Sequence, residues 1–239
     1  MNIMRTVALT KESTKDILEN LLKRSPNNYG KFEAAVGEIL NKVKTEGDAA
    51  LFAYTKEFDK TEISADTIKV TEEEIKEAYE AVDPALIDVI RKALVNIRSY
   101  HEKQRQNSWF TSETNGTMLG QKVTALERVG VYVPGGKAVY PSSVLMNIVP
   151  AKVAGVDQIV MTTPPGKDGK VNPSTLAAAK EAGADEIYKV GGAQAIGALA
   201  YGTESIPKVD KIVGPGNIFV ALAKKRSMAM SALTPLPDQ

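Results

Sequence analysis

A short apolar run that ends in a glycine turn and leads into a helical stretch occurs three times in the second half of the chain. The first copy runs through Val131-Tyr132-Val133 into Pro134-Gly135-Gly136, and the other two lie at residues 186–201 and 210–225. Apolar β-branched runs bounded by Gly and Pro are typical of buried strands. Strand, turn and helix repeated in this order favour a parallel sheet, and the turns that follow parallel strands all lie at its carboxyl edge.

The repeated unit therefore predicts an α/β fold with a doubly wound, Rossmann-like parallel sheet joined by right-handed crossovers. A small-molecule site is expected where the glycine turns meet. The spacing predicts strands at residues 130–133, 158–162, 186–190 and 211–213, with helices at 141–154, 173–182, 193–201 and 217–225.

The first half of the chain has a different pattern, dominated by long charged helices. Residues 12–57 are expected to be helical, with a break near Pro26. Thr71 and Glu74 fit a capping box, and Asp83-Pro84 fits the start of a second helix that runs to about residue 106. One or two strands are expected within residues 58–70, at the edge of a larger structure, and another at 122–127, joined closely to the strand that follows it.

Composition excludes several classes of function. The 239 residues carry 30 basic and 29 acidic side chains, a net charge of +1, which gives no overall attraction to nucleic acid or to an anionic membrane. The sequence has neither a signal-peptide pattern nor an apolar run long enough to span a bilayer, so we expect a soluble, cytoplasmic protein.

Cysteine and histidine usage limits the possible chemistry. The absence of cysteine rules out disulfides, thiolate metal sites and a cysteine nucleophile. The one histidine, His101, lies in a polar helical stretch and is interpreted as a surface residue, so a metal site with two histidines is impossible within this chain alone.

Taken singly, the glycine turns do not match standard nucleotide motifs. Gly214-Pro-Gly216 opens a helix as the dinucleotide fingerprint does, but Phe219 occupies the place of a third small residue, and no acidic strand end follows about twenty residues later. Gly192 and Gly197 have phosphate-loop spacing but lack the Lys-Ser/Thr that should follow. A single turn of this kind is more often a helix cap, whereas three turns on one sheet edge favour a ligand site.

Charged residues near the strands suggest one binding group and no acid-base pair. Asp157, Asp185 and Asp210 precede or begin strands, which places them at the amino edge, where capping or solvation is the expected role. Lys137 follows the first glycine turn and could meet a phosphate, although an exposed loop lysine is the alternative interpretation.

These motifs, taken together, resemble the histidinol dehydrogenase family. The similarity runs from about residue 30 to Lys225 in the order of the family, and it includes Phe58-Asp59 in the amino-terminal region. The segments that carry it are residues 47–51, 130–136, 140–147, 150–155, 191–200 and 211–217.

The resemblance implies an NAD-dependent and zinc-dependent oxidation of L-histidinol, through the aldehyde, to L-histidine in histidine biosynthesis, by a homodimer. By position in the family motifs, it implies that Tyr132, Gln194 and Asn217 contact NAD. A phenol and two amides suit a ring or a ribose, because they donate and accept hydrogen bonds. The first glycine turn adds Pro134, Gly136 and Lys137 as expected cofactor-binding residues.

The sequence also departs from the family pattern. Family members continue into a second half with the zinc ligands and a Glu-His acid-base pair, whereas residues 226–239 carry none of these groups. No catalytic or metal-binding residue is therefore assigned, and the chain is expected to be inactive alone. The family fold implies three segments: a helical region with an incomplete α/β domain at 1–129, a doubly wound NAD-binding domain at 130–226, and a divergent tail at 227–239.

Two further interpretations remain open from the residues. The chain could be a non-catalytic NAD-binding, nucleotide-binding or assembly module that pairs through an exposed sheet edge, since a half sheet should be rearranged or covered by a second chain. An unrelated sugar-nucleotide or phosphate binder would require the resemblance to be accidental.

Overall fold

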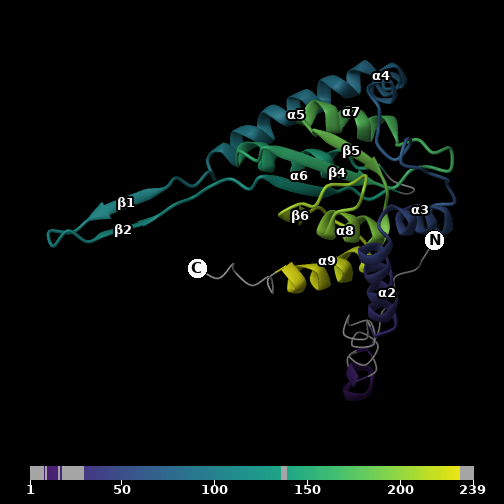
Figure 1. Ribbon diagram of the computed structural model, residues 1–239, viewed down its shortest axis with the longest axis horizontal. Coiled ribbons are helices and arrows are strands. Elements are labelled where there is room, and N and C mark those ends of the chain that lie inside the picture. The colour runs from purple at the N-terminus through teal and green to yellow at the C-terminus, as the bar shows by residue number, and fades with distance from the viewer. Residues whose placement is uncertain (1–7, 9, 16, 18–29, 136–138, 232–239) are drawn as a thin grey trace.

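The computed structural model describes residues 8, 10–15, 17, 30–135 and 139–231. In this part of the chain, a four-stranded parallel sheet lies between two layers of helices, and a two-stranded arm projects away from them (Figure 1). The α/β class and the doubly wound sheet predicted from the glycine turns are therefore confirmed.

The sheet has the strand order β5-β4-β3-β6, and its three neighbouring pairs are all parallel. The strands lie close to their predicted positions: β3 is Arg128–Tyr132, β4 Gln158–Thr163, β5 Glu186–Lys189 and β6 Lys211–Val213. From β3 the chain builds outward through β4 and β5, and then returns to place β6 on the other side of β3. This reversal is a topological switch point, where open α/β sheets usually bind ligands at the carboxyl ends of their strands.

Alternating side chains on the strands hold one helical layer on each face. Val129, Val131 and Ile159 are buried in one apolar cluster, whereas Tyr132 and Val160 belong to the opposite one. The first cluster includes α4 (Glu72–Ala81), α5 (Pro84–Glu102), α6 (Pro141–Val153) and α7 (Pro173–Ala182). The second includes α2 (Gly30–Glu46), α3 (Asp48–Phe58), α8 (Gly192–Tyr201) and α9 (Ile218–Ser231), so the sheet is covered on both sides.

Both clusters join residues from before and after the expected domain division at residue 129. Leu40 and Leu51 pack with Ile196, and Ile75 and Ile90 belong to the same cluster as Ile148. The division into 1–129 and 130–226 remains a prediction. Helix α9 continues to Ser231, beyond its expected end at Lys225, while residues 232–239 of the tail and the break near Pro26 lie outside the described residues.

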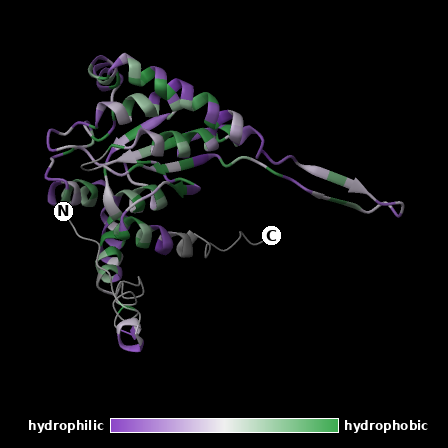
Figure 2. Ribbon diagram, turned by 180° about the vertical axis from the view of Figure 1, so that it is seen from behind, coloured by the Kyte–Doolittle hydropathy of each residue, from purple (hydrophilic) through white to green (hydrophobic). Residues whose placement is uncertain are grey.

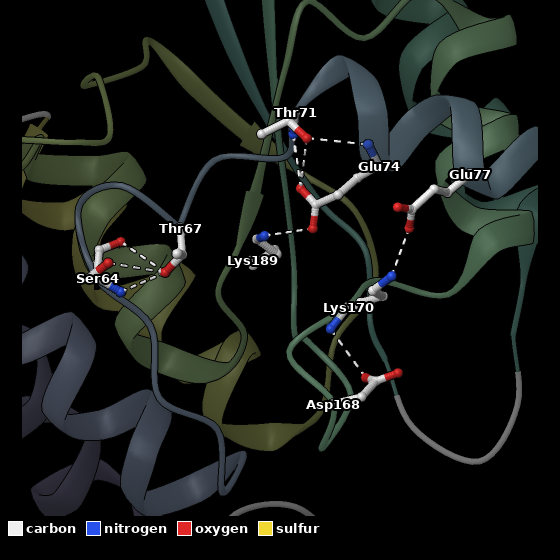
Figure 3. Close-up of polar contacts among 8 residues, drawn as sticks. All are labelled: Ser64, Thr67, Thr71, Glu74, Glu77, Asp168, Lys170 and Lys189. Carbon is white, nitrogen blue, oxygen red and sulfur yellow. Dashed lines mark hydrogen bonds and ion pairs between the residues drawn. The ribbon is translucent and has the colours of Figure 1, made fainter.

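The predicted helix starts at Thr71 and Asp83 are confirmed. The Glu74 N–H donates to Thr71 Oγ1 at 3.2 Å while the Thr71 N–H donates to the Glu74 carboxylate at 2.9 Å, which completes the capping box. Asp83 caps α5 by accepting from the Ala85 N–H at 2.9 Å. Glu74 also pairs with the buried Lys189 ammonium at 2.7 Å, so the start of α4 is fastened to the carboxyl end of β5 (Figure 3).

The strand expected at residues 122–127 is wrong. These residues are exposed and lie outside any strand, because no neighbouring strand is available to pair with them. The chain instead forms an antiparallel hairpin just upstream, from β1 (Trp109–Ser112) and β2 (Met118–Gln121), which we call the arm. Figure 2 shows that the arm has hydrophobic stretches along its strands and a hydrophilic tip.

The expectation of strands within residues 58–70 is also wrong, apart from one bridge. Lys69 pairs with Tyr188 as a single antiparallel bridge beside β5. The segment before it turns tightly, because the Ser64 N–H donates to Thr67 Oγ1 at 2.9 Å, and this turn is drawn in Figure 3. Within the described residues, no helix is both long and apolar enough to cross a bilayer.

Candidate functional site

A cleft of about 570 Å³ lies at the carboxyl ends of the central strands, at the switch point of the sheet. Residues from all three glycine turns line it, as the sequence predicts. The amino-terminal helices and the loop after β4 contribute the rest of its wall. The lining residues are Ile39, Phe58, Asp59, Tyr132, Pro134, Gly135, Pro164, Pro165, Gly192, Ala193, Gln194, Asn217 and Phe219.

Tyr132 ends strand β3 and its phenol is fixed against the start of helix α8. Its side chain is 4% exposed, and its hydroxyl oxygen accepts a hydrogen bond from the Gly192 N–H at 3.2 Å. Burial raises the pKa of the phenol; the Gly192 N–H opposes this rise, and the nearby Asp59 carboxylate adds to it. Tyr132 is therefore neutral at physiological pH and keeps a hydroxyl proton that it can donate.

Gln194 lies in the first turn of α8 and is 1% exposed. Its Oε1 atom is buried and has no hydrogen-bond partner among the described residues. Gly192 makes this position possible, because its φ is +66° and a Cβ atom there would lie 2.5 Å from that oxygen. An amide this deeply buried with a free acceptor fits a ligand that supplies a donor.

Asn217 precedes α9 and has a structural role as well as a place in the cleft. Its Oδ1 accepts from the Val220 N–H at 3.2 Å, which caps the helix. The turn before it packs closely on β3, because Gly214 has a φ of +107° and a Cβ atom there would lie 2.0 Å from the Tyr132 carbonyl oxygen. Lys224 of α9 donates to the Gly214 carbonyl and further fixes this turn.

Asp59 follows the last residue of α3 and was not among the residues expected at the site. Burial raises the pKa of its carboxyl group to about 6. Its Oδ2 atom is buried and accepts no hydrogen bond from the described residues. Asp59 is also the one charged side chain among the described residues that line the cleft.

The structure thus brings together four of the six expected cofactor-binding residues: Tyr132, Pro134, Gln194 and Asn217. The other two, Gly136 and Lys137, lie outside the described residues. A role in binding NAD stays a prediction for all six residues.

Sequence reasoning missed the side of the cleft that comes from α3 and from the loop after β4. Phe58 and Asp59 are distant in sequence from the glycine turns, so no local spacing links them to the site, although Phe58-Asp59 belongs to the family resemblance. Pro164 follows β4 and packs against two glycine turns, since a Cβ atom at Gly135 or Gly191 would lie 2.5 Å from its ring. Phe219, which argued against a standard fingerprint, supplies an aromatic wall.

The chemistry of this lining fits NAD. Aromatic and proline side chains offer flat apolar surfaces for the rings of the cofactor, while Gln194 and Asp59 offer free acceptors for its amide or hydroxyl donors. The zinc that the family resemblance implies does not fit these residues, because the described part of the chain contains no group of three or more His, Cys, Asp or Glu side chains placed to hold a metal ion.

A second cavity, of about 580 Å³, lies between the base of the arm, α6 and the amino ends of β3 and β6. It is at the opposite edge of the sheet from the glycine turns. The predicted capping role of aspartates at this edge is confirmed for two of them: Asp185 accepts from the Ile159 N–H at 2.7 Å and Asp210 from the Arg128 N–H at 2.8 Å.

Comparison with known proteins gives one consistent family. The sequence model of histidinol dehydrogenase matches residues 22–232. Histidinol dehydrogenase of Bacillus subtilis (strain 168) is 62% identical over 190 residues, which cover 80% of this chain and 44% of that protein. Histidinol dehydrogenase of Methanocaldococcus jannaschii is 55% identical over 216 residues, which cover 90% of this chain and 50% of that protein.

A solved structure agrees with the sequence relatives. The crystal structure of histidinol dehydrogenase from Elizabethkingia anophelis superimposes with a TM-score of 0.79 at 39% identity, covering 86% of this chain and 47% of that chain. The chain spans about half the length of the curated relatives it matches.

Proposed function

The chain belongs to the histidinol dehydrogenase family, and on that premise we propose that its glycine-lined cleft binds NAD for the oxidation of L-histidinol to L-histidine. The observation that carries this proposal is the meeting of Tyr132, Gln194 and Asn217 at one cleft on the carboxyl edge of the sheet. The family resemblance implies that these residues contact NAD, and the cleft lies at the switch point of the sheet, where dinucleotides bind in doubly wound folds.

Each element of the cleft has a defined task in this proposal. NAD, when bound, supplies the hydride acceptor. Tyr132 and Phe219 supply aromatic rings to the wall of the cleft for contact with a planar group, and Tyr132 is held in place by the Gly192 N–H. The buried Gln194 amide accepts from a donor of the ligand. The start of α8 offers the positive end of a helix dipole, which favours an anionic group such as a pyrophosphate.

The groups that move protons are assigned to residues outside this sequence. With one histidine in the chain and no fitting donor set for zinc among the described residues, the chain is proposed to supply the cofactor half of the reaction and to be inactive alone. We propose a cytoplasmic location, which suits a biosynthetic role of this kind.

The experiment that tests this division measures NADH formed from L-histidinol and NAD. The chain alone is expected to give no turnover above buffer, whereas addition of the carboxyl-terminal half of a family member as a separate polypeptide is expected to restore it. Turnover by the chain alone would contradict the assignment of the proton-moving groups. NAD binding without any rescue would favour the alternative function, a non-catalytic NAD-binding or assembly module.

We also propose that two copies of the chain associate through the arm, in keeping with the homodimer of the family. The eight residues of β1 and β2 are all exposed, and an isolated two-stranded hairpin is at best marginally stable in water. Its strands nevertheless carry large apolar side chains on both faces. These are Trp109, Phe110, Met118 and Leu119, which are between 54% and 68% exposed.

A further inference from the structure

Asp59 brings a carboxylate from the amino-terminal helices into a cleft that is otherwise built by the glycine turns. It follows the last residue of α3, and its backbone N–H donates to the Thr55 carbonyl oxygen at 2.9 Å, which ends the helix in a regular turn. The preceding residue, Phe58, stacks on Tyr54 with ring centroids 5.4 Å apart and ring planes 9° apart. The backbone that carries the carboxylate is thus fixed by the helix and by this aromatic pair.

Within the described residues, the carboxylate has no structural partner. Its Oδ2 atom is buried and unbonded, and no ion pair to Asp59 is found. Asp48, at the start of the same helix, contrasts with it, because that carboxylate accepts from both the backbone N–H and the hydroxyl of Ser205. A carboxylate oxygen that is buried without a donor weakens the fold unless a ligand supplies one, although the residue as a whole is only half-buried.

The chemistry of such a ligand follows from the lining. A carboxylate accepts hydrogen bonds from hydroxyl or amino groups, and two neighbouring hydroxyls suit its two oxygens. Asp59 is the one charged side chain among the described residues that line the cleft, so its negative charge would repel a phosphate dianion placed next to it. The position therefore favours the neutral diol of a ribose over a phosphorylated ribose.

Doubly wound dinucleotide sites commonly use an acidic residue about twenty positions after the glycine turn to bind the ribose 2′-hydroxyl. The sequence after Gly214-Pro215-Gly216 has no such strand end. Asp59 supplies the same functional group from a different part of the chain, on a wall of the cleft that also contains Phe58 and Phe219.

We propose that Asp59 is a specificity-determining residue that accepts hydrogen bonds from the ribose hydroxyls of NAD and excludes the 2′-phosphorylated dinucleotide NADP. This inference rests on the proposed function, because it requires that the cleft binds NAD. It adds to that function a residue and a basis for discrimination between the two cofactors.

The test is a calorimetric titration of the chain with NAD and with NADP, for the wild type and for Asp59→Asn and Asp59→Ala. Glu57→Gln is the matched control, because it removes one negative charge two residues away on an exposed side chain that does not line the cleft. Thermal melting of each variant verifies that it is folded. The proposal expects the wild type to bind NAD at least about 100-fold more tightly than NADP.

Asp59→Asn is expected to weaken NAD binding about threefold to tenfold and to strengthen NADP binding about tenfold, since the amide keeps an acceptor and loses the charge. Asp59→Ala is expected to weaken NAD binding at least tenfold, and Glu57→Gln to leave both affinities unchanged. An unchanged ratio of NAD to NADP affinity in both Asp59 variants would overturn the inference while leaving NAD binding intact. A wild-type chain that binds neither dinucleotide would instead overturn the proposed function, and the inference with it.

Discussion

The hydroxyl oxygen of Tyr132 accepts a hydrogen bond from the backbone N–H of Gly192 at 3.2 Å. This contact joins the carboxyl end of β3 to the first turn of α8 and uses an N–H group that has no acceptor within the helix. It holds the phenol ring at the wall of the cleft and leaves the hydroxyl proton available for a ligand. The same two residues thus fix the geometry of the site and one of its donors.

Gly214→Ala tests how closely the third glycine turn approaches this contact. A Cβ atom at Gly214 would lie 2.0 Å from the Tyr132 carbonyl oxygen, at a φ of +107°. Because backbone on both sides would have to move, we expect a loss of at least about 3 kcal/mol in the free energy of unfolding, measured by denaturant titration.

Gly116→Ala is the matched control for that substitution. Gly116 also has a positive φ, +84°, but a Cβ atom there would meet nothing within 4 Å. Its cost should be about 1 kcal/mol, from backbone conformation alone. Equal losses at Gly214 and Gly116 would show that the close approach to Tyr132 is unimportant.

Glu74→Gln tests the link between α4 and β5. Burial alone would raise the pKa of Glu74, but the hydrogen bonds from Lys189 and Thr71 lower it below its usual range. The variant leaves the buried Lys189 ammonium without its anion, and we expect a loss of about 2 kcal/mol at pH 7.

The pH dependence of this effect has a definite sign. Because the pKa of Glu74 is lower in the folded state, its stabilisation is complete above the unfolded value and is lost as pH falls through the folded value. The difference between wild type and Glu74→Gln should therefore shrink between about pH 5 and pH 3. Glu73→Gln, on a side chain that is 70% exposed, should change stability little at either pH, and a Glu74 effect independent of pH would refute this account.

Asp59→Asn should increase the free energy of unfolding at neutral pH, whereas Glu74→Gln should decrease it. Burial raises the pKa of Asp59 from 3.8 to about 6, so the folded state holds the proton more tightly than the unfolded state. Stability is then greatest when the carboxyl is protonated and falls as pH rises from about 4 to 6. After allowance for partial exposure, removal of the charge should add about 1 to 2 kcal/mol at pH 7.5 and almost nothing at pH 3.5.

Chemical denaturation at the two pH values, with Glu57→Gln as control, measures this gain. A variant that is less stable than wild type at pH 7.5 would mean that Asp59 has a stabilising partner in the folded chain. A gain in stability together with weaker NAD binding is the combination expected of a residue retained for ligand recognition.

If two copies of the chain associate through the arm, substitutions on its surface should disrupt the dimer. Phe110 and Leu119 lie on opposite faces of the hairpin, because Phe110 is paired with Gly120 and Leu119 with Thr111. The double substitution Phe110→Ser, Leu119→Ser should convert a dimer to a monomer in light scattering, with no change in monomer stability beyond about 0.5 kcal/mol. Val95→Ser, on an exposed α5 side chain, is the control, and a dimer that survives the arm substitutions would exclude the arm as the interface.

The sheet and most of the helix starts could be predicted from the sequence because they depend on local patterns. Short apolar runs, Gly turns and the capping residues Thr71 and Asp83 each determine structure within a few positions. Local patterns gave a wrong prediction at residues 122–127, where the chain has no neighbouring strand to pair with. They also did not reveal the arm, whose two strands pair with each other away from the core.

Local sequence patterns also predict only part of the cleft. Tyr132 lies near the end of one predicted strand and Gln194 shortly after another, so their place at one edge could be expected from the order of the elements. Asp59 reaches that edge only because α3 packs against α8, with Leu51 and Ile196 in the same cluster, and no spacing in the sequence expresses this contact. Tertiary packing rather than local propensity completes the site.

The most direct test of the central claim, that the cleft of this chain binds NAD, is a calorimetric titration of the purified chain with NAD. Tyr132→Ala and Asn217→Ala serve as cleft variants, and Tyr100→Ala, on an exposed side chain of α5, serves as the control. Saturable binding to the wild type and to the control, weakened at least about tenfold by each cleft variant, is the predicted result. Absence of saturable heat with the folded wild-type chain, or binding that neither cleft variant changes, would contradict it.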